Sequence, residues 1–181
     1  MHRDKDAVLL ELLVLRCQRG DRQALETLIR QWEGRLYYFV RRLVASEEDA
    51  WDVLQQTWMM VLKGIRSVKA PEQLPVWLYQ VARCRAMSHW RSQYRLQTHL
   101  EENDGLDAVA SPEEGTQFEN AEQVHFALGR LSLPHREVLT LFFLEDLSLI
   151  EMAEVLNVAV GTVKSRLYYA KRALRAVLEE G

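Results

Sequence analysis

Apolar residues recur every three or four positions along almost the whole chain, and the alternation typical of strands is absent. A period near 3.6 places such residues on one face of an amphipathic helix. The pattern predicts helices over residues 7–19, 22–45, 46–65 and 76–95, followed by a second helical series from residue 124 onward. The chain is therefore predicted to be all-α.

Polar residues that favour helix ends separate these segments. Asp21 follows the first predicted helix, and Ser46 is a candidate N-cap with Asp49 at the capping-box position. Pro134 suits the first turn of a later helix, and Asn157 suits a left-handed residue at a helix end. These residues predict where the helices begin and end.

The composition changes sharply between residues 101 and 122. This stretch holds eight acidic residues and no lysine or arginine, with glycine, proline and serine spread among them. Such a stretch is typical of a linker. We therefore divide the chain into two small helical domains, an N-terminal bundle over 1–98 and a C-terminal domain over 124–181, joined by an acidic linker over 99–123.

The cysteines and histidines give no support for a metal site, a cofactor or catalysis. Cys17 and Cys84 are too few and too far apart for a disulfide framework, and the five histidines form no cluster with them at metal-ligand spacing. His125 and His135 lack a nucleophile or carboxylate partner in a catalytic arrangement. We expect no metal, no cofactor and no enzymatic activity.

No stretch of the sequence predicts a membrane span or a signal peptide. The one strongly apolar stretch near the N-terminus is interrupted by Glu11, and no small-residue cleavage site follows it. A membrane-spanning helix needs about 20 consecutive, predominantly apolar residues. The low cysteine content fits a reducing compartment, so we expect a cytoplasmic protein.

The formal net charge of −3 conceals a basic segment near the C-terminus. Residues 161–177 carry five lysines and arginines and no acidic residue. On a helix, Val163 and Leu167 fall on an apolar face, and polar or basic side chains occupy the opposite face. A short apolar helix, whose Ile150 is available to pack, and the Asn157 turn precede this segment. Two helices joined by a tight turn are typical of a helix-turn-helix.

A recognition helix presents side chains to the major groove near its N-terminus and excludes acids, which the phosphates repel. The candidate DNA-binding residues on this helix are Thr162, Lys164, Ser165, Arg166, Tyr169 and Arg172. Arg172 lies further along and is better placed for phosphate than for bases. The alternative is a surface helix whose cations are only solvated. The preceding short helix, the asparagine turn and the missing acids favour DNA binding.

The helix predicted over 76–95 carries aromatic residues among arginines. Residues 73–100 contain four arginines and no acid. Unpaired bases stack on aromatic rings while guanidinium groups hold phosphates, so this pattern suits single-stranded nucleic acid. The alternative is that the stripe containing Tyr79 and Trp90 packs on another helix. The residues alone leave both interpretations open.

Met59 and Met60 fall on the polar side of the third predicted helix. Methionine adapts to varied contacts and is enriched at protein interfaces, so this pair suggests a protein partner. The alternative is a packed contact with another part of the same chain.

Three segments together resemble a bacterial RNA polymerase sigma factor of the extracytoplasmic-function group. They are DAWDVLQQTWMMV (49–61), VWLYQVARCRAMSHWR (76–91) and LSLPHREVLTLFFLEDLSLIEMAEVLNVAVGTVKSRLYYAKRAL (131–174). The resemblance implies that the first domain is like sigma region 2 and the second like sigma region 4. It implies core RNA polymerase and promoter DNA as partners, and an anti-sigma factor is a further partner common in the family.

The resemblance also implies a role for each segment. The 49–63 helix would bind the clamp helices of the polymerase β′ subunit. The 66–75 loop and the 76–95 helix would open the promoter −10 element, hold its non-template strand and capture a flipped base. The 161–175 helix would enter the major groove of the −35 element. The linker would thread through the polymerase, whose β subunit is also a partner.

Two residue sets follow from these roles. The implied polymerase-binding residues are Asp49, Asp52, Gln55, Gln56 and Met59. The implied −10-binding residues are Lys69, Arg83, Arg85, Ser88, His89 and Arg91.

Four positions depart from the family's pattern. Gln56 replaces the usual acid, and Trp51 replaces a residue that is normally polar. Cys84 and Ser88 replace the usual asparagine and aspartate after V-A-R. The −10 sequence preference of the family therefore does not carry over to this chain.

Two other classes of function fit parts of the sequence. A helix-turn-helix regulator outside the polymerase holoenzyme would need a sensor domain, and residues 1–98 lack the alternating strands of a receiver. A helical protein-interaction module would not require the acid-free runs at 73–100 and 161–178. Co-purification with core polymerase in the absence of DNA separates a sigma factor from these alternatives.

Overall fold

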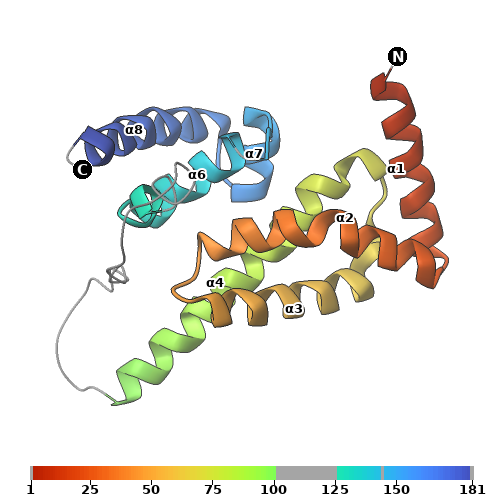
Figure 1. The fold of residues 1–181 in the computed structure, drawn as a ribbon, viewed down its shortest axis with the longest axis horizontal. Helices are drawn as coiled ribbons and strands as arrows, with labels where there is room; N and C mark the ends of the chain where they lie inside the picture. The colour runs from red at the N-terminus through yellow and green to blue at the C-terminus, as the bar shows by residue number, and fades with distance from the viewer. Residues whose placement is uncertain (1, 101–125, 144, 180–181) are drawn as a thin grey trace.

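The computed structural model describes residues 2–100, 126–143 and 145–179 (Figure 1). Within these ranges every regular element is a helix, and none of the described helices is long and apolar enough to cross a membrane. The N-terminal elements are α1 (His2–Gln18), α2 (Arg22–Arg41), α3 (Glu47–Gly64), η1 (Ile65–Ser67), η2 (Pro71–Gln73) and α4 (Leu74–Leu100). The C-terminal elements are a helical turn at 126–129, α6 (Leu133–Phe143), α7 (Leu149–Leu156) and α8 (Val160–Glu179).

Polar side chains cap the helices at their N-termini, where backbone N–H groups lack helical partners. The Asp21 carboxylate accepts hydrogen bonds from two backbone N–H groups at the start of α2. Ser46 accepts from the backbone N–H of Asp49, as predicted. Only this half of the predicted capping box forms. The Asp49 carboxylate instead accepts a hydrogen bond from the Ser46 hydroxyl at 2.8 Å and also contacts His89 of α4.

Several helix boundaries differ from the prediction. Helix α1 begins at His2, earlier than the predicted residue 7. Helix α2 ends at Arg41, because the chain turns there toward the Ser46 cap. Leu43 and Val44 are nevertheless buried in that turn, so the apolar pattern continues past the end of the helix. Helix α4 runs to Leu100, further than its apolar stripe indicated.

The N-terminal core lies where α2, α3 and α4 pack together. Tyr79 of α4 is fully buried and meets Trp32 and Phe39 of α2 edge to face, at centroid distances of 6.1 and 5.3 Å. This ring belongs to the core and is not a stacking platform for a base. The alternative in which this stripe of α4 packs on another helix is confirmed for Tyr79.

The C-terminal elements form a helix-turn-helix around a small core. Asn157 ends α7 in the left-handed conformation, with φ 53° and ψ 50°, as its residue type predicted. Val155 and Leu156 of α7 and Val163 and Leu167 of α8 are buried. Ile150, expected to pack with them, is instead 64% exposed and lines an open pocket together with Asn157 and Val160.

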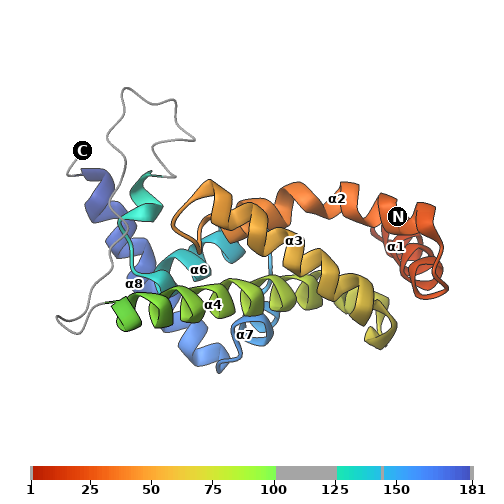
Figure 2. The same cartoon turned by 90° about the horizontal axis from the view of Figure 1, so that it is seen from below.

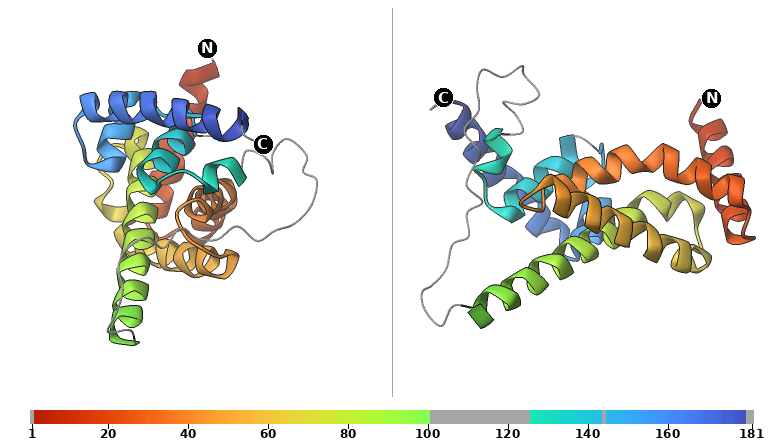
Figure 3. Two further views of the ribbon diagram at one scale, coloured as in Figure 1. Left: turned by 90° about the vertical axis from the view of Figure 1, so that its left-hand side faces the viewer. Right: turned by 60° about the horizontal axis from the view of Figure 1, so that its bottom comes forward.

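The helices α6, α7 and α8 lie together along one side of α4 (Figures 1 and 2). Helix α7 contacts α4 directly, and Figure 3 shows the same arrangement from two further directions. The predicted acidic linker over 99–123 lies outside the described residues except at its first two positions.

Candidate nucleic-acid interface

The first turns of α8 present the residues expected to contact base edges. Lys164 and Ser165 are exposed, and Thr162 and Arg166 are half-buried at the margin of the same surface. The Ser165 hydroxyl donates to the Thr162 carbonyl at 3.0 Å, which orients it along the helix. None of the four side chains is sealed in the core. Since the left-handed Asn157 sets the direction in which α8 leaves α7, it also sets where these side chains point.

The later turns of α8 carry cations next to aromatic rings. Tyr169 and Arg172 are exposed, and the Arg172 guanidinium lies 5.8 Å from the centroid of the Tyr168 ring. The Lys171 ammonium lies 4.8 Å from the Phe142 ring of α6. Such contacts hold long side chains in place without neutralising their charge. This part of α8 therefore keeps a positive surface suited to phosphate.

The connection between η1 and α4 forms an open pocket of about 230 Å³. The lining includes Lys69, Gln73, Trp77 and Gln80. Lys69 is exposed, and the other members offer an indole surface and side-chain amides. A pocket with an apolar wall and amide groups can hold a planar heterocycle such as an unpaired base.

The remaining −10 candidates lie along α4 and differ in accessibility. Arg91 is exposed and donates to the Met87 carbonyl of its own helix. Arg85 and Ser88 are half-buried. Arg83 forms an ion pair with Glu137 of α6, with 2.7 Å between Nε and Oε1. Arg83 is thus engaged by the C-terminal elements and is not turned toward solvent.

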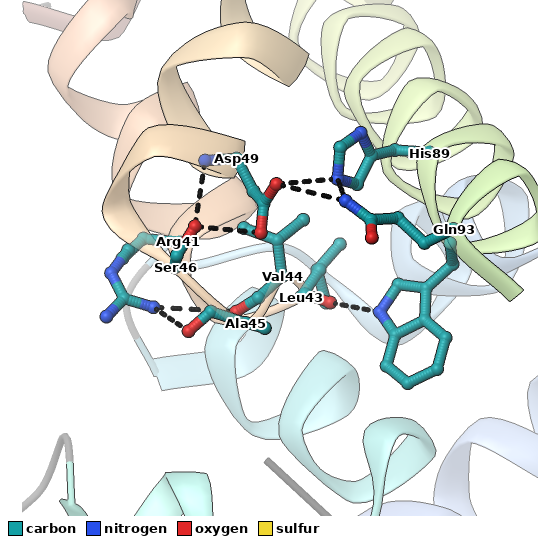
Figure 4. Close-up of polar contacts among 9 residues, drawn as sticks. Arg41, Leu43, Val44, Ala45, Ser46, Asp49, His89 and Gln93 are labelled. Carbon is teal, nitrogen blue, oxygen red and sulfur yellow. Dashed lines mark hydrogen bonds and ion pairs between the residues drawn. The ribbon is translucent and has the colours of Figure 1, made fainter. Parts of the chain in front are cut away.

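Asp49 and His89 were expected in two different sites, and the structure brings them together (Figure 4). The Asp49 carboxylate lies 2.9 Å from His89 Nε2 and accepts a hydrogen bond from the Gln93 side chain at 3.4 Å. This group joins α3 to α4. Asp49 is only partly exposed, so in this conformation it supports the position of α3 and presents little of its charge to a partner.

The turn between α2 and α3 is held by a second set of polar contacts in the same region. Trp90 donates its indole N–H to the Leu43 carbonyl at 2.9 Å. Arg41 donates to the carbonyls of Val44 and Ala45 (Figure 4). Trp90 is therefore anchored to the turn through its indole N–H.

The outward side of α3 carries the other polymerase-binding candidates. Asp52, Gln55, Gln56 and Met59 are all exposed. The sequence prediction did not include Trp51, which is 49% exposed and contributes most of the aromatic surface there. The sequence did hold a signal for this surface, because Trp51 stands where the family normally has a polar residue.

Trp51 also connects this side of α3 to α2. Its ring lies 4.4 Å from the Tyr37 ring, measured between centroids. Two further apolar side chains, Met60 and Leu62, are exposed on α3. An apolar and aromatic surface of this kind on a described helix indicates a protein-binding site.

A third cluster, missed in the sequence, joins the two halves of the chain. The buried Glu145 carboxylate accepts hydrogen bonds from Arg35 Nε at 2.9 Å and from the Tyr79 hydroxyl. Burial raises the pKa of Tyr79 above its ordinary value, and the neighbouring Glu145 charge raises it further. Because 110 residues separate Arg35 from Glu145, periodicity could not pair them.

Comparison with known proteins decides the family. Residues 28–96 match the model of Sigma-70 region 2, and residues 121–174 match that of Sigma-70 region 4. These two regions occur in the same order and on the same helices as the two candidate DNA-binding surfaces. The chain belongs to the sigma-70 family of RNA polymerase sigma factors. As a sigma factor, it acts in promoter recognition and transcription initiation.

Relatives of known function define the group within the family. The sigma factor is 24% identical to the ECF RNA polymerase sigma factor SigW of Bacillus subtilis, over 96% of this chain and 98% of that protein. It is 28% identical to the RNA polymerase sigma-H factor of Pseudomonas aeruginosa, over 92% of each chain. It is a sigma factor of the extracytoplasmic-function (ECF) group.

A solved structure shares the fold. The sigma factor RpoE of Bartonella quintana, solved in complex with the anti-sigma factor NepR, superposes with a TM-score of 0.72 at 23% identity, over 85% of this chain and 96% of that one. The fold described above, with its N-terminal and C-terminal groups of helices, is therefore the fold of a known sigma factor.

Proposed function

We propose that this sigma factor binds core RNA polymerase through the outward side of α3. Asp52, Gln55, Gln56 and Met59 supply polar and adaptable contacts, and Trp51 supplies a large aromatic anchor. Tryptophan is enriched among residues that dominate interface energetics. We assign Asp49 a supporting role, since His89 and Gln93 hold it against α4.

Binding of core polymerase in the absence of DNA tests this assignment. Trp51→Ala should weaken binding about tenfold, because truncating an interface anchor costs at least about 1 kcal/mol. Leu9→Ala is the matched control, since Leu9 is an exposed apolar residue of α1 outside this surface. Met60→Ala tests the other edge of α3. If Trp51→Ala bound core polymerase as the wild type does while Met60→Ala bound it more weakly, the docking surface would lie on the other edge of α3.

For the −10 element, we assign single-strand binding to α4 and the loop before it. Lys69, Arg85 and Arg91 would meet phosphates, while Ser88 and the pocket beside Gln80 would meet bases. Arg83 would join them once it is released from Glu137. His89 would act indirectly, by fixing the position of α4 relative to Asp49. Binding of unpaired bases would offset the cost of unstacking the duplex.

For the −35 element, we assign major-groove recognition to α8. Thr162, Lys164, Ser165 and Arg166 would reach base edges, and Tyr169 and Arg172 would contact the backbone. The observation that carries this proposal is the accessibility of these acid-free turns directly after the left-handed residue Asn157.

The two recognition surfaces would act as parts of one bipartite reader. We divide the chain into a region 2-like domain over 1–98, a linker over 99–123 and a region 4-like domain over 124–181. Two DNA-binding modules on one tether gain from effective concentration. The eight acids of residues 101–122 would imitate a nucleic-acid backbone in a basic channel of the polymerase, whose β and β′ subunits would both contact the sigma factor.

The sigma factor would carry out no bond chemistry of its own and would work in the cytoplasm, where the polymerase is found. An anti-sigma factor is a further partner in this proposal. The solved structure of a sigma factor with NepR supports it, since that protein shares this fold. Such a partner would cover the outward side of α3 or the basic side of α8.

A further inference from the structure

An open apolar pocket lies where α7 and α8 meet at the Asn157 turn (Figure 1). Its volume is about 380 Å³, and its lining includes Ile150 of α7 together with Ala159 and Val160 at the start of α8. Ile150 is 64% exposed, Ala159 is exposed, and Val160 is half-buried. An apolar surface is thus open to solvent beside the N-terminus of the recognition helix.

The charge of this pocket does not suit a phosphate. Among the described residues that line it, Glu154 is the only charged one, and its charge is negative. Lys164 follows Val160 by one helical turn and lies beside the pocket without lining it. A phosphate would therefore bind to the cations further along α8, and the pocket itself suits an uncharged, apolar group.

Gly161 leaves space next to the pocket. Apart from its chain neighbours and its own helix backbone, a Cβ added at Gly161 would meet no described atom within 4 Å. Alanine favours a helix more than glycine does, and there is room for it here. The packing of the chain therefore does not explain this glycine, whereas the close approach of another molecule to the helix backbone would.

A DNA duplex offers one small apolar group in its major groove, the C5-methyl group of thymine. The N-terminal residues of a recognition helix are those that reach the base edges in this groove. Side chains on a helix lean toward its N-terminus, so Val160, the first residue of α8, lies at the leading tip. The apolar pocket is therefore at the end of α8 that would meet a thymine.

We propose that Ile150 and Val160 form a binding site for the C5-methyl group of one thymine in the −35 element, and that Gly161 lets the base edge approach. The inference rests on the −35 role proposed above for α8 and adds specificity-determining residues to it. The upstream element contains a thymine that is recognised by its methyl group.

Removal of that methyl group from the DNA tests the site in the complete holoenzyme. The probe is the promoter most enriched when the wild-type holoenzyme binds a random library of duplexes. It is resynthesised with single thymines on either strand replaced by deoxyuridine, which lacks only the methyl group and pairs as thymine does. At one upstream position this replacement should weaken binding about fourfold, the amount that burial of one methyl group contributes.

Protein variants show whether this pocket holds the methyl group. In Ile150→Ala and Val160→Ala the deoxyuridine penalty at that position should shrink toward none, because the two groups no longer interact. Leu178→Ala, an exposed apolar position near the other end of α8, is the matched control and should keep the full penalty. Circular dichroism reports that each variant is folded, and the high exposure of Ile150 makes its variant the least disruptive.

Gly161→Ala tests the close approach. This variant should bind the selected promoter more weakly than the wild type while its thermal stability stays equal or rises, because alanine favours the helix. A purely structural glycine would instead lose stability on substitution. Wild-type binding by Gly161→Ala would remove the close approach from the proposal.

Two results would overturn the methyl site. One is an enriched upstream element in which no deoxyuridine replacement changes binding. The other is a penalty that stays full in both Ile150→Ala and Val160→Ala. If Ile150→Ala instead weakened binding of core polymerase without DNA, the pocket would belong to a protein partner. If the wild-type holoenzyme enriched no upstream element at all, the −35 role itself would fail, so the two failures are distinguishable.

Discussion

Two arginines of α8 are expected to contribute differently to DNA binding. Arg166 lies near the start of α8 and borders the surface that would face base edges, whereas Arg172 lies further along beside Tyr168. Base contacts give sequence selectivity, and phosphate contacts give affinity that depends on salt. The net charge of the chain predicts neither property, since DNA responds to the local surface.

We expect Arg166→Ala and Arg172→Ala to separate these two effects. Arg166→Ala should cost about 1–3 kcal/mol on duplexes that carry the −35 element and little on unrelated duplexes. Arg172→Ala should weaken binding to all sequences and make the log–log salt slope shallower by about 1. Titration of labelled duplexes at several salt concentrations measures both the affinity and the salt slope. Arg22→Ala, at an exposed position of α2, is the control. A wild-type salt slope for Arg172→Ala would remove Arg172 from the phosphate contacts.

At the scale of the element, one turn sets the direction of the recognition helix. Asn157 adopts a left-handed conformation between α7 and α8, and its backbone N–H contacts the carbonyls of Ala153 and Glu154. Side chains with a branched or bulky Cβ are disfavoured in this conformation, while asparagine and glycine tolerate it. The position of α8, and therefore of its polar face, depends on this residue.

Substitution of Asn157 should report the strain of that turn. Asn157→Ala should lower the free energy of unfolding by about 1 kcal/mol, since alanine pays the left-handed penalty. Asn157→Gly should leave it nearly unchanged. Urea denaturation followed by circular dichroism compares the two variants. Equal stability of both variants would mean that the turn does not constrain α8.

Local pattern predicted much of the fold because helices depend on neighbours three and four positions apart. It identified the caps Asp21 and Ser46, the left-handed Asn157 and the apolar face of α8. It misplaced Ile150, whose exposure depends on where α7 meets other helices. It also could not pair Asp49 with His89 or Arg83 with Glu137, because tertiary packing decides those contacts.

At the scale of the whole molecule, two oppositely charged features act together. Helix α4 and residues 161–177 of α8 contain no acid and are candidate DNA-binding surfaces, whereas residues 101–122 of the proposed linker hold eight acids. The N-terminal and C-terminal groups of helices contact each other through α4 and α7. We expect function at this scale to depend on the tether as well as on the two surfaces.

Neutralising the linker tests its charge. Replacing all eight acids of residues 101–122 with asparagine or glutamine should weaken assembly with core polymerase or lower the yield of initiation. A linker with the same residues in scrambled order keeps the charge and should act as the wild type does. Native gel analysis of the holoenzyme and single-round transcription measure the two steps. Unchanged assembly and transcription in the neutral variant would exclude an electrostatic role.

Run-off transcription by purified core polymerase on a library of promoters tests the central claim most directly. We expect the wild-type chain to select templates with two separated sequence elements, and Arg166→Ala to lose selectivity at the upstream element while keeping it at the downstream one. A library transcribed without enrichment of any bipartite promoter would contradict the account.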